Sequence, residues 1–349
     1  MIPVWKDRDV YISTTEPINY FIEYYGGDRV FEGVAVPKPN SNSVSIRINN
    51  FAKNMVDSDV DADRIFDIQH NMDYHIIPNY CREIAIGKRN EDNGNTLIFS
   101  DYFCNDYNYN TDGDDDYNIY GNYGYDDVHL ISNKITHLTN RGHCLFTLFN
   151  CWENDVTIKV TEEDVQGNGG VVFNFTIPSL SAAVVSGRNF TPGLYYVFYN
   201  TYDDDAEIGR YLAVESCNRY NLHYINAKGG YDTLPIDGRK DKRTDNLTFE
   251  YYKSKGNNQN INKPQINKFK VDITPKWELQ TGWLSDEQSK KMYNLFTSQK
   301  VWLEDIDEGT FTPVYITNNA VDYKTFTNNG RKKYNYSISV TSANTLIKL

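Results

Sequence analysis

Alternating apolar and polar residues predict β-strands along most of the chain. Val44, Ile46 and Ile48 alternate with polar neighbours, and the same pattern recurs in residues 172–177 and 334–340. A period of two places successive side chains on opposite faces of a strand, so each run predicts a strand with one buried face. The pattern is that of an all-β protein.

Between residues 129 and 215 the strand pattern becomes regular. Short apolar runs recur at intervals of about 8–12 residues, which is typical of an immunoglobulin-like β-sandwich. Turn residues separate the runs, as at Gly167-Asn168-Gly169-Gly170 and Thr191-Pro192-Gly193. Residues 209–252 continue the β pattern as a connecting region.

The C-terminal stretch contains the one helix that the sequence predicts. Ser285-Asp286-Glu287-Gln288 fits a capping box, in which the Ser and Gln side chains satisfy free backbone N–H groups. The helix is expected from about Asp286 to Ser298. Its expected buried contacts are Met292, Tyr293, Leu295 and Phe296. Three tryptophans are expected to anchor the packing around it: Trp277, Trp283 and Trp302.

Length predicts two or three β-sandwich domains. The chain has 349 residues, and a domain has about 100–200. We expect an N-terminal β domain over residues 1–127, a central β-sandwich over residues 128–253, and a C-terminal β module with one short helix over residues 264–349. Residues 254–263 are polar and rich in Gly and Asn, so they are expected to form a linker or an exposed loop.

Residues 105–127 interrupt the strand pattern with Asn, Asp, Gly and Tyr. With almost no aliphatic residue to bury, they predict a long surface loop, and their tyrosines favour a contact role. Asp112, Asp114, Asp115 and Asp116 resemble the start of a calcium loop. However, Tyr117 and Tyr123 replace the Gly and Glu that an EF-hand requires, so a solvated acidic loop is favoured and calcium stays the open alternative.

No histidine or cysteine spacing predicts a metal site. The histidines form no HExxH or H-x-H motif, and we expect them to be ordinary surface or partly buried side chains. The cysteines form no CxxC motif, and we expect free buried thiols in a reducing compartment. The residues are His70, His75, His129, His137, His143 and His223, and Cys81, Cys104, Cys144, Cys151 and Cys217.

Motifs for catalysis and phosphate binding are also missing. The chain has no Gly-x-Ser-x-Gly nucleophile elbow, and Gly167–Gly170 has no Lys-Ser or Lys-Thr of a phosphate loop. Asp203-Asp204-Asp205 is expected to be a turn. The sequence therefore predicts a protein that is not an enzyme, with no catalytic, cofactor-binding or metal-binding residues.

Charge and hydropathy argue against two kinds of partner, a tightly bound nucleic acid and a membrane. The net charge is −12, which argues against tight phosphate binding, because that needs a basic surface. The first residues lack the basic and apolar parts of a signal peptide, and no apolar run has the roughly 18 residues of a membrane helix. We expect no membrane partner.

Two stretches resemble tail-associated virion proteins of bacteriophages that infect gut Bacteroidetes. The first is Leu222–Asp232, with the order aromatic, apolar, Asn, two variable residues, Gly-Gly, aromatic, Asp. The second runs from Trp277 to Lys324 and includes the predicted helix. Together with the Asn- and Tyr-rich composition, they make the chain most similar to a tail ring protein of a crAss-like phage.

The resemblance implies a structural protein of the virion tail, made in the host cytoplasm. Its partners would be copies of itself in a ring and neighbouring tail, connector or portal proteins, with DNA passing through without specific binding. The resemblance implies no cofactor. Residues 105–127 and 254–263 are the expected contact segments.

Two other functions remain open from the sequence. Exposed aromatic side chains clustered along one groove would favour a receptor- or carbohydrate-binding tail protein. A glycan-degrading enzyme requires two facing carboxylates in a cleft.

Overall fold

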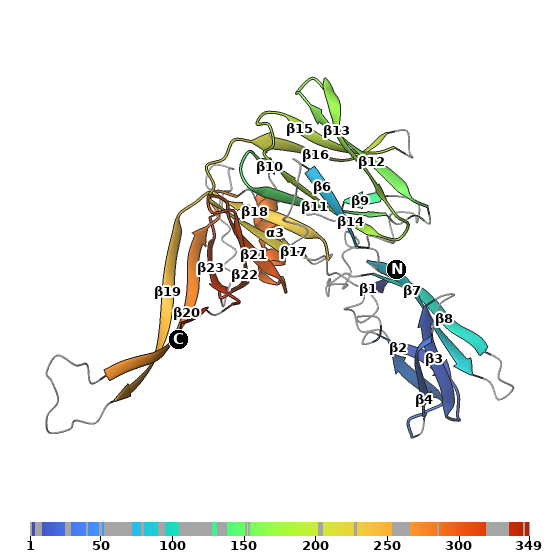
Figure 1. The fold of residues 1–349 in the computed structure, drawn as a ribbon. Helices are drawn as coiled ribbons and strands as arrows, with labels where there is room; N and C mark the ends of the chain where they lie inside the picture. The colour runs from blue at the N-terminus through green and yellow to red at the C-terminus, as the bar shows by residue number, and fades with distance from the viewer. Residues whose placement is uncertain are drawn as a thin grey trace, which may run out of the picture.

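The computed structural model describes residues 2–3, 9–24, 29–39, 41–48, 51, 72–77, 80–89, 95–104, 128–130, 138–150, 152, 154–201, 205–226, 229–252, 266–284, 286–318, 335–344 and 346–348. Most of this part of the chain is in β-sheets, mainly antiparallel, and it contains one short helix, which confirms the all-β prediction. Figure 1 shows three groups of strands, N-terminal, central and C-terminal.

The N-terminal module packs a five-stranded sheet against a two-stranded one. The larger sheet has the order β1-β8-β7-β3-β4, and β2 pairs with β5. As the alternation predicts, Val44, Ile46 and Ile48 are buried, and they share a core with Ile22 and Ile84. The bounds are β1 Ile2–Pro3, β2 Asp9–Ser13, β3 Ile18–Tyr24, β4 Arg29–Ala35, β5 Ser43–Arg47, β7 Cys81–Arg89 and β8 Asn95–Cys104.

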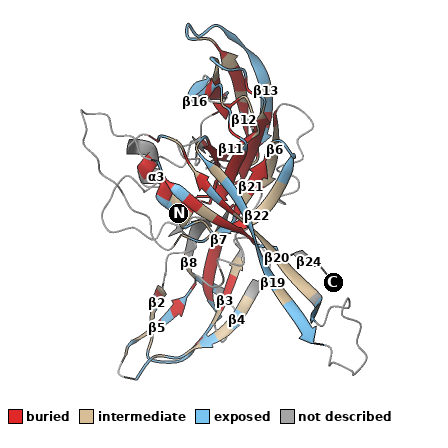
Figure 2. Ribbon diagram, turned by 90° about the vertical axis from the view of Figure 1, so that its left-hand side faces the viewer, coloured by how far each residue is buried: buried red, intermediate tan, exposed pale blue. Residues whose placement is uncertain are grey.

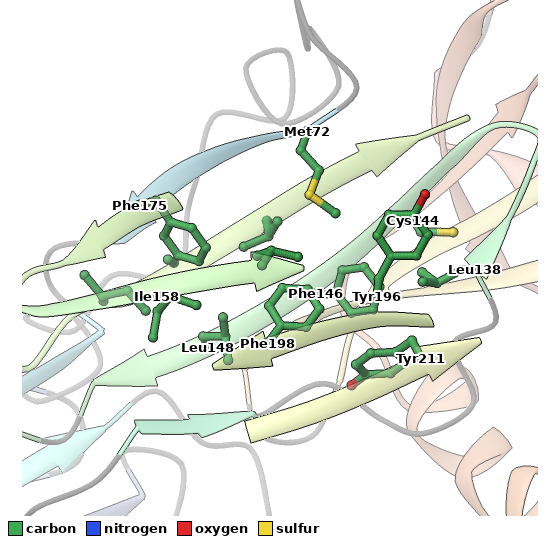
Figure 3. Packing of buried hydrophobic residues seen from close by; sticks show 14 of the residues in the cluster. Met72, Leu138, Cys144, Phe146, Leu148, Ile158, Phe175, Tyr196, Phe198 and Tyr211 are labelled. Atoms are coloured by element: carbon green, nitrogen blue, oxygen red, sulfur yellow. The ribbon is translucent and has the colours of Figure 1, made fainter. Parts of the chain in front are cut away.

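The central module is a sandwich of two sheets with the orders β10-β16-β15-β12-β13 and β6-β14-β11-β9. Phe146 of β11 packs between the sheets, with its ring centroid 5.2 Å from that of Phe198 and 4.7 Å from that of Tyr211 (Figure 3). The bounds are β6 Met72–Ile77, β9 Val128–Leu130, β10 Leu138–Thr139, β11 His143–Asn150, β12 Val156–Glu163, β13 Gly169–Ile177, β14 Ala182–Arg188, β15 Tyr195–Asn200 and β16 Ala206–Val214.

The C-terminal module is an eight-stranded sheet with the helix α3 on one face. The strand order is β18-β17-β21-β22-β23-β20-β19, and β24 also pairs with β20. Leu222, Trp277 and Leu303 from the sheet share one core with Met292 and Leu295 from the helix. The bounds are β17 Tyr220–Ile225, β18 Tyr231–Ile236, β19 Lys240–Tyr252, β20 Ile266–Gln280, α3 Asp286–Phe296, β21 Val301–Asp305, β22 Thr310–Ile316, β23 Ser337–Ser342 and β24 Leu346–Lys348.

Two sets of strands pair across the expected domain limits, which themselves stay a prediction. β6, expected in the first domain, pairs with β14 of the central sandwich from Met72–Gly187 to Ile77–Ala182. β17 and β18, expected in the central domain, belong to the C-terminal sheet because β17 pairs with β21. Pairing between segments that are distant in the sequence decides which sheet β6, β17 and β18 join, and local alternation does not encode such pairing.

Residues 254–263 connect two paired strands. These residues lie outside the described part of the chain, but β19 and β20 pair antiparallel up to Tyr252 and Ile266 on either side of them. The expected linker or exposed loop at residues 254–263 therefore stays a prediction. The Gly-rich turn also lies earlier than expected: it spans residues 164–168, and Gly169 already begins β13.

The helix and its tryptophans match the sequence expectations in part. α3 ends at Phe296, two residues early, and Met292 and Leu295 are fully buried. Tyr293 is 57% exposed, because one residue along a helix turns the side chain about 100° from its neighbour. Trp277 is buried as expected, whereas Trp283 follows a turn at Gly282 and is 71% exposed, so its expected packing role is wrong.

Candidate functional site

Three strands of the C-terminal sheet are buried on both faces. Leu222 of β17, Leu234 of β18 and Leu303 of β21 face the helix and belong to its core. The alternate positions of these strands face the central module, where β11 lies against β18. These positions are occupied by polar and aromatic residues: Asn221, His223, Tyr231, Thr233, Trp302 and Glu304. We call the polar members of this set, together with His143 and Thr147 of β11, the polar junction.

Glu304 lies at the centre of the polar junction, and its carboxylate accepts hydrogen bonds from both modules. From β11, the His143 ring donates through Nδ1 to Oε1 at 2.6 Å, and the His143 backbone N–H lies 3.1 Å from Oε2. From β17, Asn221 Nδ2 donates to Oε2 at 2.7 Å, and His223 Nε2 lies 3.1 Å from Oε2. Several donors on one carboxylate replace the water that burial removes.

The hydrogen bonds that run from Leu145 through Thr233 and His223 to Glu304 are all satisfied by one placement of the protons. The Leu145 backbone N–H of β11 donates to Thr233 Oγ1 at 2.9 Å. Thr233 Oγ1 lies 2.8 Å from His223 Nδ1, so its hydroxyl donates there when His223 is neutral with its proton on Nε2. In that tautomer His223 donates to Glu304, and donors and acceptors alternate from β11 through β18 and β17 to β21.

Thr147 adds a second connection between β11 and β18. The Tyr231 backbone N–H donates to Thr147 Oγ1 at 2.8 Å, and the Thr147 hydroxyl donates back to the Tyr231 carbonyl at 3.3 Å. β18 is the end strand of its sheet, and end strands leave backbone groups unpaired. The Thr147 side chain of β11 therefore satisfies the backbone groups of Tyr231 at this edge of the C-terminal sheet.

The ionisation of Glu304 and His223 is shifted by burial and by their mutual contact. Burial raises the pKa of Glu304, but hydrogen bonds from His143 and His223 outweigh it and hold that pKa well below its usual value. Burial lowers the pKa of His223 more than the hydrogen bond to Glu304 raises it. The junction is therefore stable as a carboxylate with a neutral His223.

Ion pairs at the surface extend the junction outward. Arg141, just before β11, donates from Nη2 to Asp307 Oδ1 at 2.6 Å. Arg219, just before β17, donates from Nη2 to Asp305 Oδ2 at 3.1 Å. The hydrogen bond from Arg219 lowers the pKa of Asp305, although burial raises it.

The side chains of the polar junction are hydrogen-bonded to one another and are buried from solvent. His223 is fully buried, and the Glu304 side chain is 3% exposed. Burial raises the pKa of the neighbouring Cys144 thiol to about 12, so its nucleophilic thiolate form is strongly disfavoured. Among the described residues, no group of His, Cys, Asp and Glu side chains has the arrangement of a metal site. The geometry is that of a structural junction between two modules.

Sequence reasoning did not single out Glu304, and it treated His143 and His223 as ordinary histidines. His143 and His223 are both buried in the junction. The alternation in β17 does mark Asn221 and His223 as a polar face, but that face is normally solvent-exposed. Only the packing of β11 against it shows its role.

The other candidate residues take no part in the junction. Asp112–Asp116, His70, His137 and Cys151 lie outside the described residues. Asp205 pairs with Lys159 beside the β15–β16 hairpin, where a turn is expected, whereas Asp203 and Asp204 lie outside the described residues. His75 and His129 lie on β6 and β9, and Cys81 and Cys104 occupy opposed register positions on β7 and β8. Cys217 is free but exposed, contrary to expectation.

The stretch Leu222–Asp232 runs from within β17 to the start of β18. Asn226 Oδ1 accepts the Gly230 N–H at 3.1 Å, and Asn226 Nδ2 donates to Asp232 Oδ2 at 2.8 Å. Gly229 has a φ of 77°, which favours glycine. The Asn, Gly-Gly and Asp positions therefore build the hairpin that holds Tyr231 and Thr233 against β11.

No protein-family model matches the chain, and no curated protein matches its sequence. Among the described residues, no helix has the length and apolar character needed to cross a bilayer.

Acidification is expected to weaken the protein through the junction. The pKa of His223 is lowered from 6.5, so below pH 6.5 the unfolded chain binds more protons and stability falls. One pH unit below 6.5, His223 lowers the free energy of unfolding by at most about 1.4 kcal/mol. The lowered pKa of Glu304 adds a further loss below its unfolded value of 4.5.

Urea unfolding between pH 5.5 and 8, monitored by tryptophan fluorescence, measures this effect. His223→Gln keeps a donor toward Glu304 but does not titrate, so its stability is expected to change less over this interval. If the stability of the variant and that of the wild type changed equally over this pH interval, His223 would not be the source of the pH dependence.

Proposed function

We propose that the protein is a non-enzymatic structural component of a bacteriophage virion, which assembles into a ring in the tail or connector through which DNA passes. The observation that supports this most is the polar junction, where Glu304 accepts hydrogen bonds from His143 of the central module and from Asn221 and His223 of the C-terminal module. Such a junction fixes the two modules relative to each other, which a ring subunit requires.

The resemblance to tail ring proteins of crAss-like phages supplies the class of assembly. The described residues of both stretches belong to the C-terminal module: Leu222–Asp232 spans parts of β17 and β18, and the second stretch includes α3, β21 and β22. The resemblance therefore falls on the half of the junction that includes Glu304. The ring would contain copies of this chain beside neighbouring tail, connector or portal proteins.

The charge of the chain fits the passage of DNA. A net charge of −12 gives an acidic surface, and like charge keeps nucleic acid from adhering. We expect an acidic inner surface of the ring; a neutral or basic lumen would contradict this part of the proposal.

Exposed aromatic side chains favour one alternative, a receptor- or carbohydrate-binding tail protein. Trp283, Tyr293 and Tyr315 are each more than half exposed, and aromatic rings of this kind stack on sugars. They lie on three different elements: a turn, α3 and β22.

Negative-stain microscopy and mass photometry of the purified protein, mixed with its neighbouring virion proteins, test the proposal. Discrete rings of uniform diameter are expected. A monomer that binds glycans on an array and forms no ring in the mixture would overturn the ring in favour of the alternative.

A further inference from the structure

The central and C-terminal modules have separate hydrophobic cores. Among the described residues, the cluster around Phe146 is made by the central module alone, and the cluster around Leu222 by the C-terminal module alone. β11 is buried along its whole length (Figure 2), with Cys144 and Phe146 in the central core. The alternate residues of β11, such as His143 and Leu145, face the polar junction. The modules can therefore part at the junction without breaking either of these cores.

A short segment carries the chain from one module to the other. Residues 215–219 lie between β16 and β17 and are in neither helix nor strand. Ser216 within this segment is hydrogen-bonded to both modules, to Asn140 Oδ1 at 3.0 Å and to Asp237 Oδ1 at 2.8 Å. A few residues without regular structure can absorb the backbone rotation of a hinge. Residues 215–219 are therefore placed to act as the pivot between the modules.

Protonation of His223 disturbs the hydrogen bonds that hold β11 to the C-terminal sheet. In the neutral tautomer, His223 Nδ1 accepts the Thr233 hydroxyl at 2.8 Å, and Thr233 Oγ1 accepts the Leu145 N–H at 2.9 Å. A second proton makes Nδ1 a donor, so the Thr233 hydroxyl turns away and loses its acceptor. A buried donor without an acceptor costs free energy. The closed junction therefore resists this proton, in agreement with the pKa of His223, which burial lowers.

An open junction accepts the proton without unfolding. Opening removes β11 with His143 and lets water reach His223. Glu304 stays beside it, because β17 and β21 are paired within the C-terminal sheet and His223 Nε2 lies 3.1 Å from Glu304 Oε2. A neighbouring carboxylate favours the imidazolium. The unfolded chain does not keep this neighbour, so acid stabilises the open form more than the unfolded one.

The other charged groups around His223 favour the same direction or do not change in mild acid. Positive charge on His143 lowers the pKa of His223, and Arg188 of β14 lies opposite His143 in register. Burial raises the pKa of Cys144 to about 12, so this thiol stays neutral. At the surface, the ion pairs contribute little. The remaining groups are Arg141 with Asp307, Arg219 with Asp305, and Asp232 of β18 with Asn226.

We propose that acidification opens the polar junction, so that the central and C-terminal modules part as folded units about residues 215–219. The inference does not depend on the proposed ring. At neutral pH the junction holds the two modules in one orientation. In acid the open form gains at most about tenfold in population for each pH unit below the pKa that His223 has when open.

Hydrogen exchange of the full chain at pH 7.5 and 5.5 tests the proposal, with the rate at each amide divided by its intrinsic rate. The references are the amides of β12 and β23, which lie inside their sheets and outside the junction. The reporters are three backbone N–H groups that donate across the junction: His143 to Glu304, Leu145 to Thr233 and Tyr231 to Thr147.

Two variants and one further measurement complete the test. His223→Gln keeps a donor toward Glu304 but does not titrate. The matched control is His75→Gln, which replaces a histidine on β6, a strand with no member in the polar junction. Small-angle X-ray scattering of the wild type at both pH values measures the separation of the modules, and circular dichroism verifies that their strands are kept.

From pH 7.5 to 5.5, protection at the three reporters is expected to fall about tenfold in the wild type and in His75→Gln, while the references keep theirs. The maximum dimension of the wild type is expected to increase. His223→Gln is expected to protect the reporters equally at both pH values. Equal loss at reporters and references means global unfolding and overturns the proposal, as does unchanged protection in the wild type or a wild-type response in His223→Gln. If His223→Gln does not fold, exchange and scattering of the wild type decide.

Discussion

Replacing Glu304 with leucine is expected to lower the free energy of unfolding by about 3–5 kcal/mol, the range for removing one member of a buried charged network. Leucine has a similar volume but no acceptor. The change therefore leaves the donors of His143, Asn221 and His223 buried without the carboxylate that they share. Urea unfolding monitored by tryptophan fluorescence measures the loss.

Hydrogen exchange locates the loss. The backbone N–H of His143 donates to Glu304, so its exchange is expected to accelerate in the variant. Glu308→Gln is the matched control: Glu308 lies in the turn after β21 with its side chain 55% exposed, and its substitution is expected to change stability by less than about 0.5 kcal/mol. If Glu304→Leu also changed the free energy of unfolding by less than about 0.5 kcal/mol, the junction would not be what holds the two modules together.

Gly142→Ala is expected to destabilise the protein by about 2–4 kcal/mol, from backbone strain and overpacking together. Gly142 precedes β11 with a φ of 73°, a conformation that side chains disfavour. An added Cβ would lie 2.9 Å from Glu304 Oε2 and 2.8 Å from Ile306 Cδ1, and would collide with the Asn221 amide. The substitution therefore pushes into the polar junction from the central module.

Gly167→Ala separates these two causes. Gly167 has a similar φ of 82°, but an added Cβ would meet no atom within 4 Å. It is expected to cost only the backbone strain, about 1–2 kcal/mol. The two stabilities are compared by thermal and urea unfolding, and equal losses in both variants would mean that the space around Gly142 accommodates a methyl group.

Local patterns predicted the strands better than their partners. Val44, Ile46 and Ile48 are buried as their alternation requires, because one face of a half-buried strand is decided by residues two apart. The sheet to which β6 belongs was not predictable in this way. Its hydrogen bonds go to β14, about a hundred residues later in the chain, and no local pattern specifies that choice.

The junction escaped prediction for a related reason. In β21, Glu304 follows the apolar residue Leu303 and resembles the charged end of an ordinary strand. Asn221 and His223 occupy the positions that alternation assigns to solvent. All three are buried because a second module covers that face, which is a property of tertiary packing. Trp283 is the opposite case, since a large apolar side chain lies in solvent after a turn.

The position of β6 within the chain has a consequence for the order of folding during synthesis. The strands of the N-terminal module are complete at Cys104, whereas the partner of β6 begins at Ala182. At about 5–20 residues per second, a ribosome needs several seconds to produce the intervening chain. During that interval we expect the N-terminal sheet to be folded already, while the backbone groups of β6 still lack their partners on β14. We therefore expect the central sandwich to form on a strand that is already connected to a folded N-terminal module.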